Sequence, residues 1–242
     1  RSTACAGGAR VLAYRGPSLH LLSWRVAVDR VMPLSELAGH VFTLPDQPDL
    51  VPYRTSYYAD AWGFCMADAC WRALPDGDYR AVIDARHFDG RLTYAEWFKP
   101  GETEDEMLLS AHICHPSLAN DNCSSLAVLT RLAERLSRRR TRYSYRVLFA
   151  PGTIGAICWL ARNEERVERI RHGLVVAGVG DAGGPTYKKS RRGDAFVDRA
   201  MAHILQHTTG EPPVVDFSPY GYHERQFCSP GFCLPVGPLP GS

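Results

Sequence analysis

One imidazole and two carboxylates follow or border apolar segments in the middle of the chain. His112 closes the apolar run 107–112, Asp121 comes nine residues later, and Asp181 follows the apolar run 173–179. Imidazole nitrogen and carboxylate oxygen are ligands that zinc takes in proteins, and a carboxylate can also bridge two ions. Each residue alone has a structural explanation, as a core histidine, a helix cap or a turn residue. The three together predict a metal site.

A second group of reactive side chains lies in the segment 218–230, which is predicted to be a long loop. His223 could bind metal or act as an acid–base group at neutral pH. Glu224 could be the general base that takes a proton from a metal-bound water. A structural alternative stays open, in which Glu224 pairs with Arg225 and His223 is exposed to solvent.

Three residues are candidates for binding substrate, namely Tyr222, Arg225 and His115. Tyr222 and Arg225 flank the His-Glu pair of the loop. His115 precedes a proline, which favours an extended backbone there, and a structural role for His115 stays equally open. The basic run 188–192 could clamp a substrate carboxylate or phosphate, although a solvated surface is the simpler explanation.

Alternating strands and helices in residues 101–242 are expected to position these side chains. The spacing of apolar residues predicts strands at 107–112, 145–150, 173–179, 214–217 and 232–236, and helices at 122–137, 156–162, 164–170 and 194–207. This order is typical of a three-layer α/β/α domain, in which binding groups gather at the carboxyl ends of parallel strands. His112, Gly152 and Asp181 fall at such ends, and Asp121 is expected to cap the helix 122–137.

Residues 11–100 are predicted to form a separate, mostly β domain. Alternation of apolar and polar residues predicts a strand from residue 22, and two more at 79–84 and 92–98 that are joined as a hairpin through 87–91. The acidic turn 99–106 marks the boundary. We therefore expect two domains, at 11–100 and 101–242.

Composition and charge exclude several classes of partner. The 242 residues carry a net charge of +2, so nothing favours nucleic acid or a membrane surface as the main partner. No apolar run approaches the roughly 20 residues that a membrane helix needs. The first ten residues lack the features of a secretory signal and resemble a fragment boundary. Most of the eight cysteines lie in apolar runs, which favours reduced thiols and a cytoplasmic location over a Cys228–Cys233 disulfide.

The order of these motifs resembles that of the co-catalytic zinc aminopeptidase superfamily. The matching residues are His112, the run Asp121-Asn122-Cys123-Ser124, and Asp181 after a strand. Further runs are similar to one branch, the aminopeptidase-like proteins associated with polysaccharide-biosynthesis genes; they lie at 52–58, 114–122, 188–194 and 225–232.

The resemblance implies a phosphorylase/hydrolase-like three-layer fold into which a small β domain is inserted. It also implies one or two zinc ions, with His112 on one ion, Asp121 bridging two and Asp181 on the other. The implied substrate is a small peptide or amino-acyl amide. A homo-oligomer is a further expectation.

Three positions depart from the superfamily pattern. Cys114 stands where an Asp supports the histidine ligand, and the segment 149–155 has no carboxylate where a Glu pair supplies the general base and a zinc ligand. The family's last histidine motif is not reached before Ser242. The resemblance therefore implies a chain that is truncated at both ends and lacks part of the catalytic set.

These observations leave three hypotheses. The first is a metal-dependent hydrolase of aminopeptidase type, in which His112, Asp121 and Asp181 hold zinc and Glu224 or a missing residue takes the proton. The second is a degenerate relative that binds a ligand or partner without catalysis. The third, cysteine chemistry at Cys114, is the weakest, because Cys114 would compete for the metal.

Overall fold

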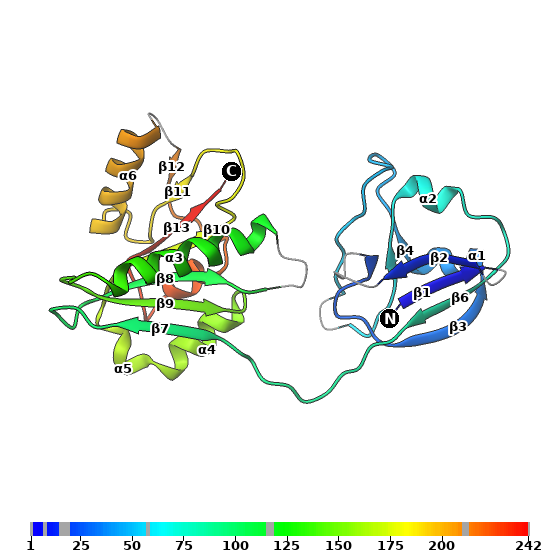
Figure 1. Ribbon diagram of the computed structural model, residues 1–242, viewed down its shortest axis with the longest axis horizontal. Coiled ribbons are helices and arrows are strands. Elements are labelled where there is room, and N and C mark those ends of the chain that lie inside the picture. The colour runs from blue at the N-terminus through cyan, green and yellow to red at the C-terminus, as the bar shows by residue number, and fades with distance from the viewer. Residues whose placement is uncertain are drawn as a thin grey trace. The chain divides into compact units, whose positions relative to one another are not determined.

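The chain folds into two compact units, Arg1–Gly90 and Arg91–Ser242 (Figure 1). The computed structural model describes residues 2–6, 9–14, 20–56, 59–114, 119–209 and 213–241, with side chains from residue 20 onward except that of residue 209. Within these ranges, no helix has the length and apolar character needed to cross a membrane. The seven cysteines whose side chains are described, including Cys228 and Cys233, are free thiols.

The first unit is built on a four-stranded antiparallel sheet in the order β2-β1-β6-β3. Its strands are β1 (Ser2–Ala6), β2 (Ala9–Tyr14), β3 (Val28–Pro33) and β6 (Asp78–Ile83). Alternate residues of β6 are buried because successive side chains of a strand point to opposite faces. Tyr79 and Ile83 on this face pack with Met32, Leu37 and Phe64 to form the core of the unit.

Short elements complete the first unit. They are α1 (Leu34–Leu37), the 3-10 turn η2 (Ala38–His40), β4 (Val41–Phe42), β5 (Phe64–Cys65) and α2 (Asp68–Arg72). The strands β4 and β5 pair in parallel, and the His40 ring stacks on Trp62 with centroids 3.6 Å apart. Trp62 therefore serves packing within this unit.

The second unit is organised around a five-stranded sheet in the order β13-β10-β8-β9-β7. The strands are β7 (Ala95–Lys99), β8 (Glu106–His112), β9 (Ser144–Ala150), β10 (Ile170–Ala177) and β13 (Val236–Pro240). All neighbours are parallel except β7, which runs antiparallel to β9. The predicted hairpin is therefore wrong, because β6 and β7 belong to different sheets.

Helices cover both faces of this sheet, as the three-layer prediction required (Figure 1). Leu109 and Val147 pack under α3, whereas the adjacent Leu108 and Leu148 pack against α4, α5 and α7. The helices are the π turn η3 (Asn120–Ser124), α3 (Ser125–Ser137), α4 (Ile154–Arg162), α5 (Glu164–Val167) and α7 (His223–Phe227). Adjacent residues of these parallel strands are buried on both faces, so the strands are continuous apolar runs in the sequence.

Several boundaries differ from the sequence predictions; for example, the helix predicted at 164–170 ends at Val167, and β10 begins at Ile170. The segment 218–230 is not a continuous loop, because α7 occupies its centre, and the last strand begins at Val236 rather than at Phe232. The remaining elements, β11 (Tyr187–Lys188), β12 (Val214–Val215) and α6 (Phe196–Thr209), form a cluster in which Tyr187, Val197, Met201 and Leu205 are buried.

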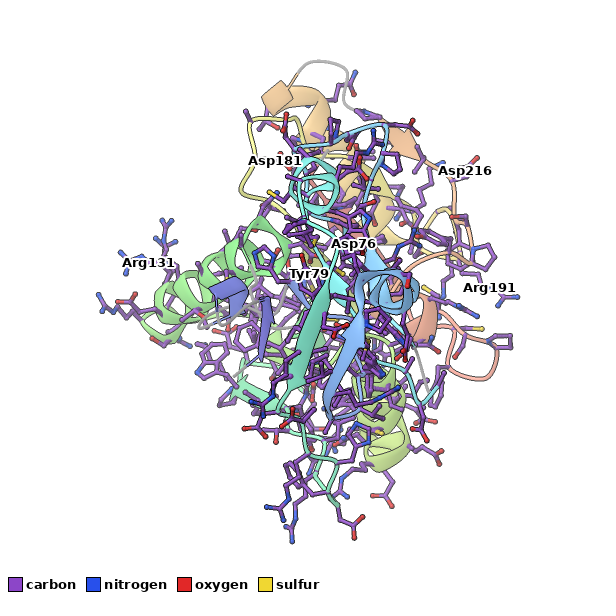
Figure 2. The ribbon with its side chains drawn as sticks, turned by 90° about the vertical axis from the view of Figure 1, so that its right-hand side faces the viewer. Asp76, Tyr79, Arg131, Asp181, Arg191 and Asp216 are labelled. Carbon is purple, nitrogen blue, oxygen red and sulfur yellow. The ribbon has the colours of Figure 1, made fainter. Side chains whose placement is uncertain are left out.

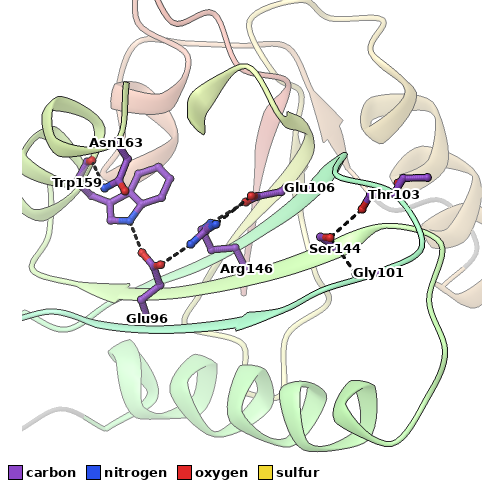
Figure 3. Close-up of polar contacts among 8 residues, drawn as sticks. All are labelled: Glu96, Gly101, Thr103, Glu106, Ser144, Arg146, Trp159 and Asn163. Atoms are coloured by element: carbon purple, nitrogen blue, oxygen red, sulfur yellow. Dashed lines mark hydrogen bonds and ion pairs between the residues drawn. The ribbon is translucent and has the colours of Figure 1, made fainter. Parts of the chain in front are cut away.

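A buried charge network ties β7 to β8, β9 and α4 (Figure 3). The guanidinium of Arg146 donates to both carboxylate oxygens of Glu106, at 2.6 and 2.9 Å, and also to Glu96. Glu96 in turn accepts from the indole N–H of Trp159 at 2.6 Å. The side chains of Arg146 and Glu106 are only 5% and 3% exposed, so each charge depends on the other for compensation.

The network predicts a large loss of stability on removal of its cation. Arg146→Met leaves Glu106 buried beside Glu96 without a counter-charge, which should cost about 3–5 kcal/mol in the free energy of unfolding measured with urea. The control is Arg138→Met, because Arg138 pairs with Glu134 at 2.8 Å on the surface of α3. It should cost at most about 1 kcal/mol. Equal losses of stability in the two variants would contradict the conclusion that Glu106 depends on Arg146 for its counter-charge.

Candidate functional site

His112 and Asp121 meet at the carboxyl end of β8. The Nε2 atom of His112 lies 2.7 Å from Oδ1 of Asp121, and their side chains are 3% and 57% exposed. A histidine that is held inside the domain thus faces a carboxylate that is open to solvent. The prediction that Asp121 caps α3 is wrong. The N-cap residue of this helix is Ser124, and no side chain makes a capping hydrogen bond there.

Asn122 holds the histidine in place from inside the domain. Its Nδ2 donates to the carbonyl oxygen of His112 at 3.0 Å and lies 3.3 Å from His112 Nδ1. Its Oδ1 accepts from the backbone N–H of Gly178 at 3.0 Å. The Asn122 side chain is fully buried, and one amide therefore bridges the ends of β8 and β10. The peptide bond between Asp121 and Asn122 is cis.

Asp181 lies on the loop after β10 and is labelled in Figure 2. Its Oδ2 accepts from Nδ2 of Asn120 at 2.9 Å, and its Oδ1 accepts from the backbone N–H of Gly183 at 3.0 Å. Oδ1 of Asn120 also accepts from the N–H of Gly180 at 2.7 Å. Asn120 therefore fastens the Asp181 loop to η3.

Two of the three predicted metal ligands, His112 and Asp121, lie 2.7 Å apart, whereas the third, Asp181, bonds to Asn120. Across the described ranges, no group of three His, Cys, Asp or Glu side chains is arranged to hold an ion. His112 and Asp121 supply the donor chemistry of zinc, but zinc sites usually have at least three protein ligands. The donors present therefore fit a metal ion in part, and the assignment of His112, Asp121 and Asp181 stays a prediction.

The ring of Tyr222 covers the histidine. Its centroid lies 4.8 Å from that of His112, with an angle of 11° between the ring planes. Gly152 follows the end of β9, and a Cβ atom there would come within 2.9 Å of Tyr222 Cδ1 and 3.6 Å of Cys114 Sγ. A larger residue at 152 would therefore meet the tyrosine ring at the candidate site.

Cys114 lies beside the same glycine. Desolvation raises the pKa of its thiol, and the negative charge of Asp121 raises that pKa further, against the lowering effect of the Gly152 N–H. A thiol that stays protonated is a poor nucleophile. These surroundings disfavour cysteine chemistry at this position.

His223 is buried with both ring nitrogens occupied. Its Nε2 lies 3.1 Å from the carbonyl oxygen of Pro151, which can only accept, so Nε2 donates. Its Nδ1 lies 2.8 Å from the hydroxyl oxygen of Ser110, which donates to the carbonyl oxygen of Leu148 at 3.2 Å. Burial lowers the pKa of His223 to about 4, and the nearby His112 lowers it as well, while the bond to Pro151 raises it. The predicted acid–base role of His223 therefore finds no open nitrogen in this arrangement.

Glu224 is also engaged inside the domain. Its Oε1 lies 3.1 Å from Nζ of Lys188, and its Oε2 accepts from the backbone N–H of Tyr222 at 3.2 Å. Lys188 also donates to the carbonyl oxygen of Tyr220. This pair holds the chain segment that carries Tyr222, which is a structural use of the carboxylate proposed as general base.

The remaining predicted binding residues are placed as follows. Arg225 is exposed on α7 and does not take the partner expected for it, because Glu224 pairs with Lys188. Lys189 pairs with Asp216 at 2.9 Å, whereas Arg191 is exposed (Figure 2). His115 lies outside the described residues. The basic run is thus partly used in ion pairs.

Three positioning residues were missed by the sequence reasoning, namely Asn120, Asn122 and Ser110. The signal was present for two of them, because an amide on each side of Asp121 offers a donor and an acceptor at the end of a strand. Ser110 gave no signal, since its partner His223 is 113 residues away in the chain.

The buried state of His223 predicts how stability changes with pH. Between pH 6.5 and about 4 the unfolded chain binds a proton that the folded imidazole does not. The free energy of unfolding should therefore fall as the pH drops through this window, by up to about 3 kcal/mol from this residue. NMR titration should show a neutral His223 ring down to about pH 4. A midpoint near 6.5, or an unchanged pH dependence in His223→Gln, would contradict this placement.

The comparisons with known proteins agree on the fold. The family described as "Domain of unknown function (DUF4910)" matches residues 4–242. A protein of Clostridium acetobutylicum, named for polysaccharide biosynthesis and an aminopeptidase-like domain, is 47% identical over 232 residues, which are 96% of this chain and 54% of that protein. The chain thus spans about half the length of this curated relative.

Two solved structures are similar along the whole chain. A crystal structure of a protein from Clostridium acetobutylicum, described as a peptidase, has a TM-score of 0.96 at 45% identity and is covered to 57% of its length. The zinc aminopeptidase BSAP from Bacillus subtilis has a TM-score of 0.69 at 10% identity and is covered to 71%. The second likeness shows the fold alone. Together with the family match, these likenesses show that the chain belongs to the DUF4910 family of aminopeptidase-like proteins.

Proposed function

We propose that this chain carries part of the active site of a metal-dependent, peptidase-type hydrolase. The observation that supports it is the 2.7 Å approach of His112 Nε2 to Asp121 Oδ1 at the carboxyl end of β8. Ligands of α/β sheets bind at such strand ends. Zinc bound there supplies Lewis-acid activation of a water molecule. The proposed substrate is a small peptide or an amino-acyl amide, and Asp181 is proposed as a further ligand.

The chain's own residues prepare the two ligands for a cation. Carboxylate oxygens only accept, so a proton on Nε2 of His112 occupies the space between the ring and Asp121. His112 and Asp121 would hold a metal there, and the Nε2 proton would then pass to Nδ1 of the ring or to solvent. Asn122 fixes the ring from the other side, which limits the freedom that metal binding has to remove.

The metal hypothesis predicts the effect of removing the histidine. Purified protein dialysed against zinc should bind one or two equivalents, and His112→Ala should weaken this binding by at least about 10-fold. The rate of hydrolysis of amino-acyl p-nitroanilides should fall by about 100-fold or more, because a misplaced metal no longer holds the reacting groups in position.

The matched control is His87→Ala, which replaces a histidine of the first unit that bonds to the carbonyl oxygen of Arg25 at 3.1 Å. It should retain both zinc binding and turnover. A folded wild-type protein that neither binds zinc nor cleaves any such substrate would refute the hydrolase proposal.

Gly152 favours a second candidate function, namely ligand binding without hydrolysis. The superfamily that the sequence resembles places its general base after the corresponding strand, and this chain has a glycine-containing loop there. The Tyr222 ring lies where a side chain at 152 would project. Glu224 does not replace the missing base, because it is 5% exposed and paired with Lys188. The residues at the carboxyl end of β8 would then hold an amino-acyl ligand without cleaving it.

The second candidate predicts a gain of activity from a restored carboxylate. Gly152→Glu combined with Tyr222→Ala places a base near His112 and frees the space that it needs. If only the base is missing, turnover should rise by about 100-fold or more over wild type, as expected for general base catalysis. The control is Gly152→Gln with Tyr222→Ala, because glutamine has nearly the size of glutamate but cannot act as a base. Efficient turnover by the wild type would refute this candidate.

The setting of the protein is also a proposal. The free thiols agree with a reducing compartment, and we propose the cytoplasm. The name of the Clostridium relative suggests a role beside polysaccharide biosynthesis, which we extend to this chain.

A further inference from the structure

The helix α6 presents two histidines to solvent on its outer face. Val197, Met201 and Leu205 recur every four residues and bury the inner face of the helix. His203 and His207 lie one turn apart on the opposite side, and both are exposed. Their ring centroids are 4.2 Å apart, with an angle of 49° between the planes. Residues four apart on a helix are neighbours, so both rings can reach a single ion.

The hydrogen bonding of His207 presents one nitrogen as a ligand. Its Nδ1 lies 2.8 Å from the carbonyl oxygen of His203. A carbonyl oxygen only accepts, so Nδ1 carries the proton and the neutral ring has its lone pair on Nε2. Metal-binding histidines usually have this arrangement, in which one ring nitrogen donates to a backbone carbonyl and the other binds the metal.

Buried contacts anchor the helix that carries the pair. Asp198, which is 2% exposed, accepts from the Tyr187 hydroxyl at 2.8 Å, from the Ser190 hydroxyl at 2.7 Å and from the Ala195 N–H at 2.9 Å. The first turn of α6 is therefore fixed to β11 and to the loop before the helix. The two histidines belong to the carboxyl-terminal half of the helix, where the helix dipole favours a positive charge.

We propose that His203 and His207 form a surface site for a divalent transition metal, with Cu²⁺, Ni²⁺ and Zn²⁺ as the suitable ions. Imidazole suits these metals, and Cu²⁺ binds most tightly of them. The helix supplies two nitrogen ligands, and water or a donor from another molecule takes the remaining positions. This site is separate from the His112–Asp121 pair, which lies at the end of β8 and supplies one nitrogen and one oxygen.

The test is a titration of the metal-free protein with Cu²⁺, in which calorimetry measures the affinity and electron paramagnetic resonance identifies the ligands. The wild type should bind an ion whose spectrum shows two nitrogen ligands. His203→Asn and His207→Asn should each weaken this binding by about 10-fold or more, because the second imidazole acts as a tethered ligand. Cu²⁺ should also raise the Tm of the wild type more than that of either variant, since only the folded helix brings the two imidazoles together.

Two controls separate this site from the other candidate. Gln206→Asn changes an exposed residue on the same turn and should leave Cu²⁺ binding unchanged. His112→Ala should leave the two-nitrogen spectrum intact, whatever it does to hydrolysis. Unchanged Cu²⁺ affinity and spectrum in both folded histidine variants of α6 would overturn the proposal.

Discussion

The bridge that Asn122 makes between β8 and β10 is the constraint on which the candidate site depends. Its buried amide bonds to the carbonyl of His112 and to the N–H of Gly178, so backbone groups at the ends of two adjacent strands are satisfied by one side chain. A buried amide that lost a partner would cost about 1–3 kcal/mol, which keeps this arrangement in place. His112 is thereby held with its Nε2 directed at Asp121. Metal binding, hydrolysis and ligand binding at this site all depend on this orientation of His112.

Most of the other polar groups around the site are used to hold its walls. Lys188 and Glu224 form a buried ion pair that secures the segment leading to Tyr222, and Tyr222 stacks on His112. His223 stays neutral between Ser110 and Pro151 and fastens α7 to the ends of β8 and β9. Side chains committed in this way are not available as acids or bases. Among the described residues of the site, few acidic or basic groups are therefore free to react, which is why binding without hydrolysis competes with catalysis as its function.

Local sequence patterns were sufficient to predict the layers of the second unit. Continuous apolar runs predicted β8, β9 and β10, because strands buried on both faces lack alternation, and helical spacing predicted α3, α4 and α6. The position of His112 at the end of a strand followed from the same pattern, and the resemblance to zinc aminopeptidases agrees with the comparisons. These features are determined over short stretches of chain, where each residue's neighbours in the sequence are also its neighbours in space.

Contacts between distant segments decided the rest. The pairing of β7 with β9 is stabilised by Arg146 and Glu96, which are 50 residues apart, and no local pattern distinguishes it from a hairpin with β6. Likewise, only the folded chain shows that Glu224 meets Lys188, that Tyr222 covers His112, and that Asp181 bonds to Asn120. The sequence alone thus determined which chemical groups lie at the strand ends. The tertiary structure decided which of them are free to react, because burial and long-range partners set the state of each group.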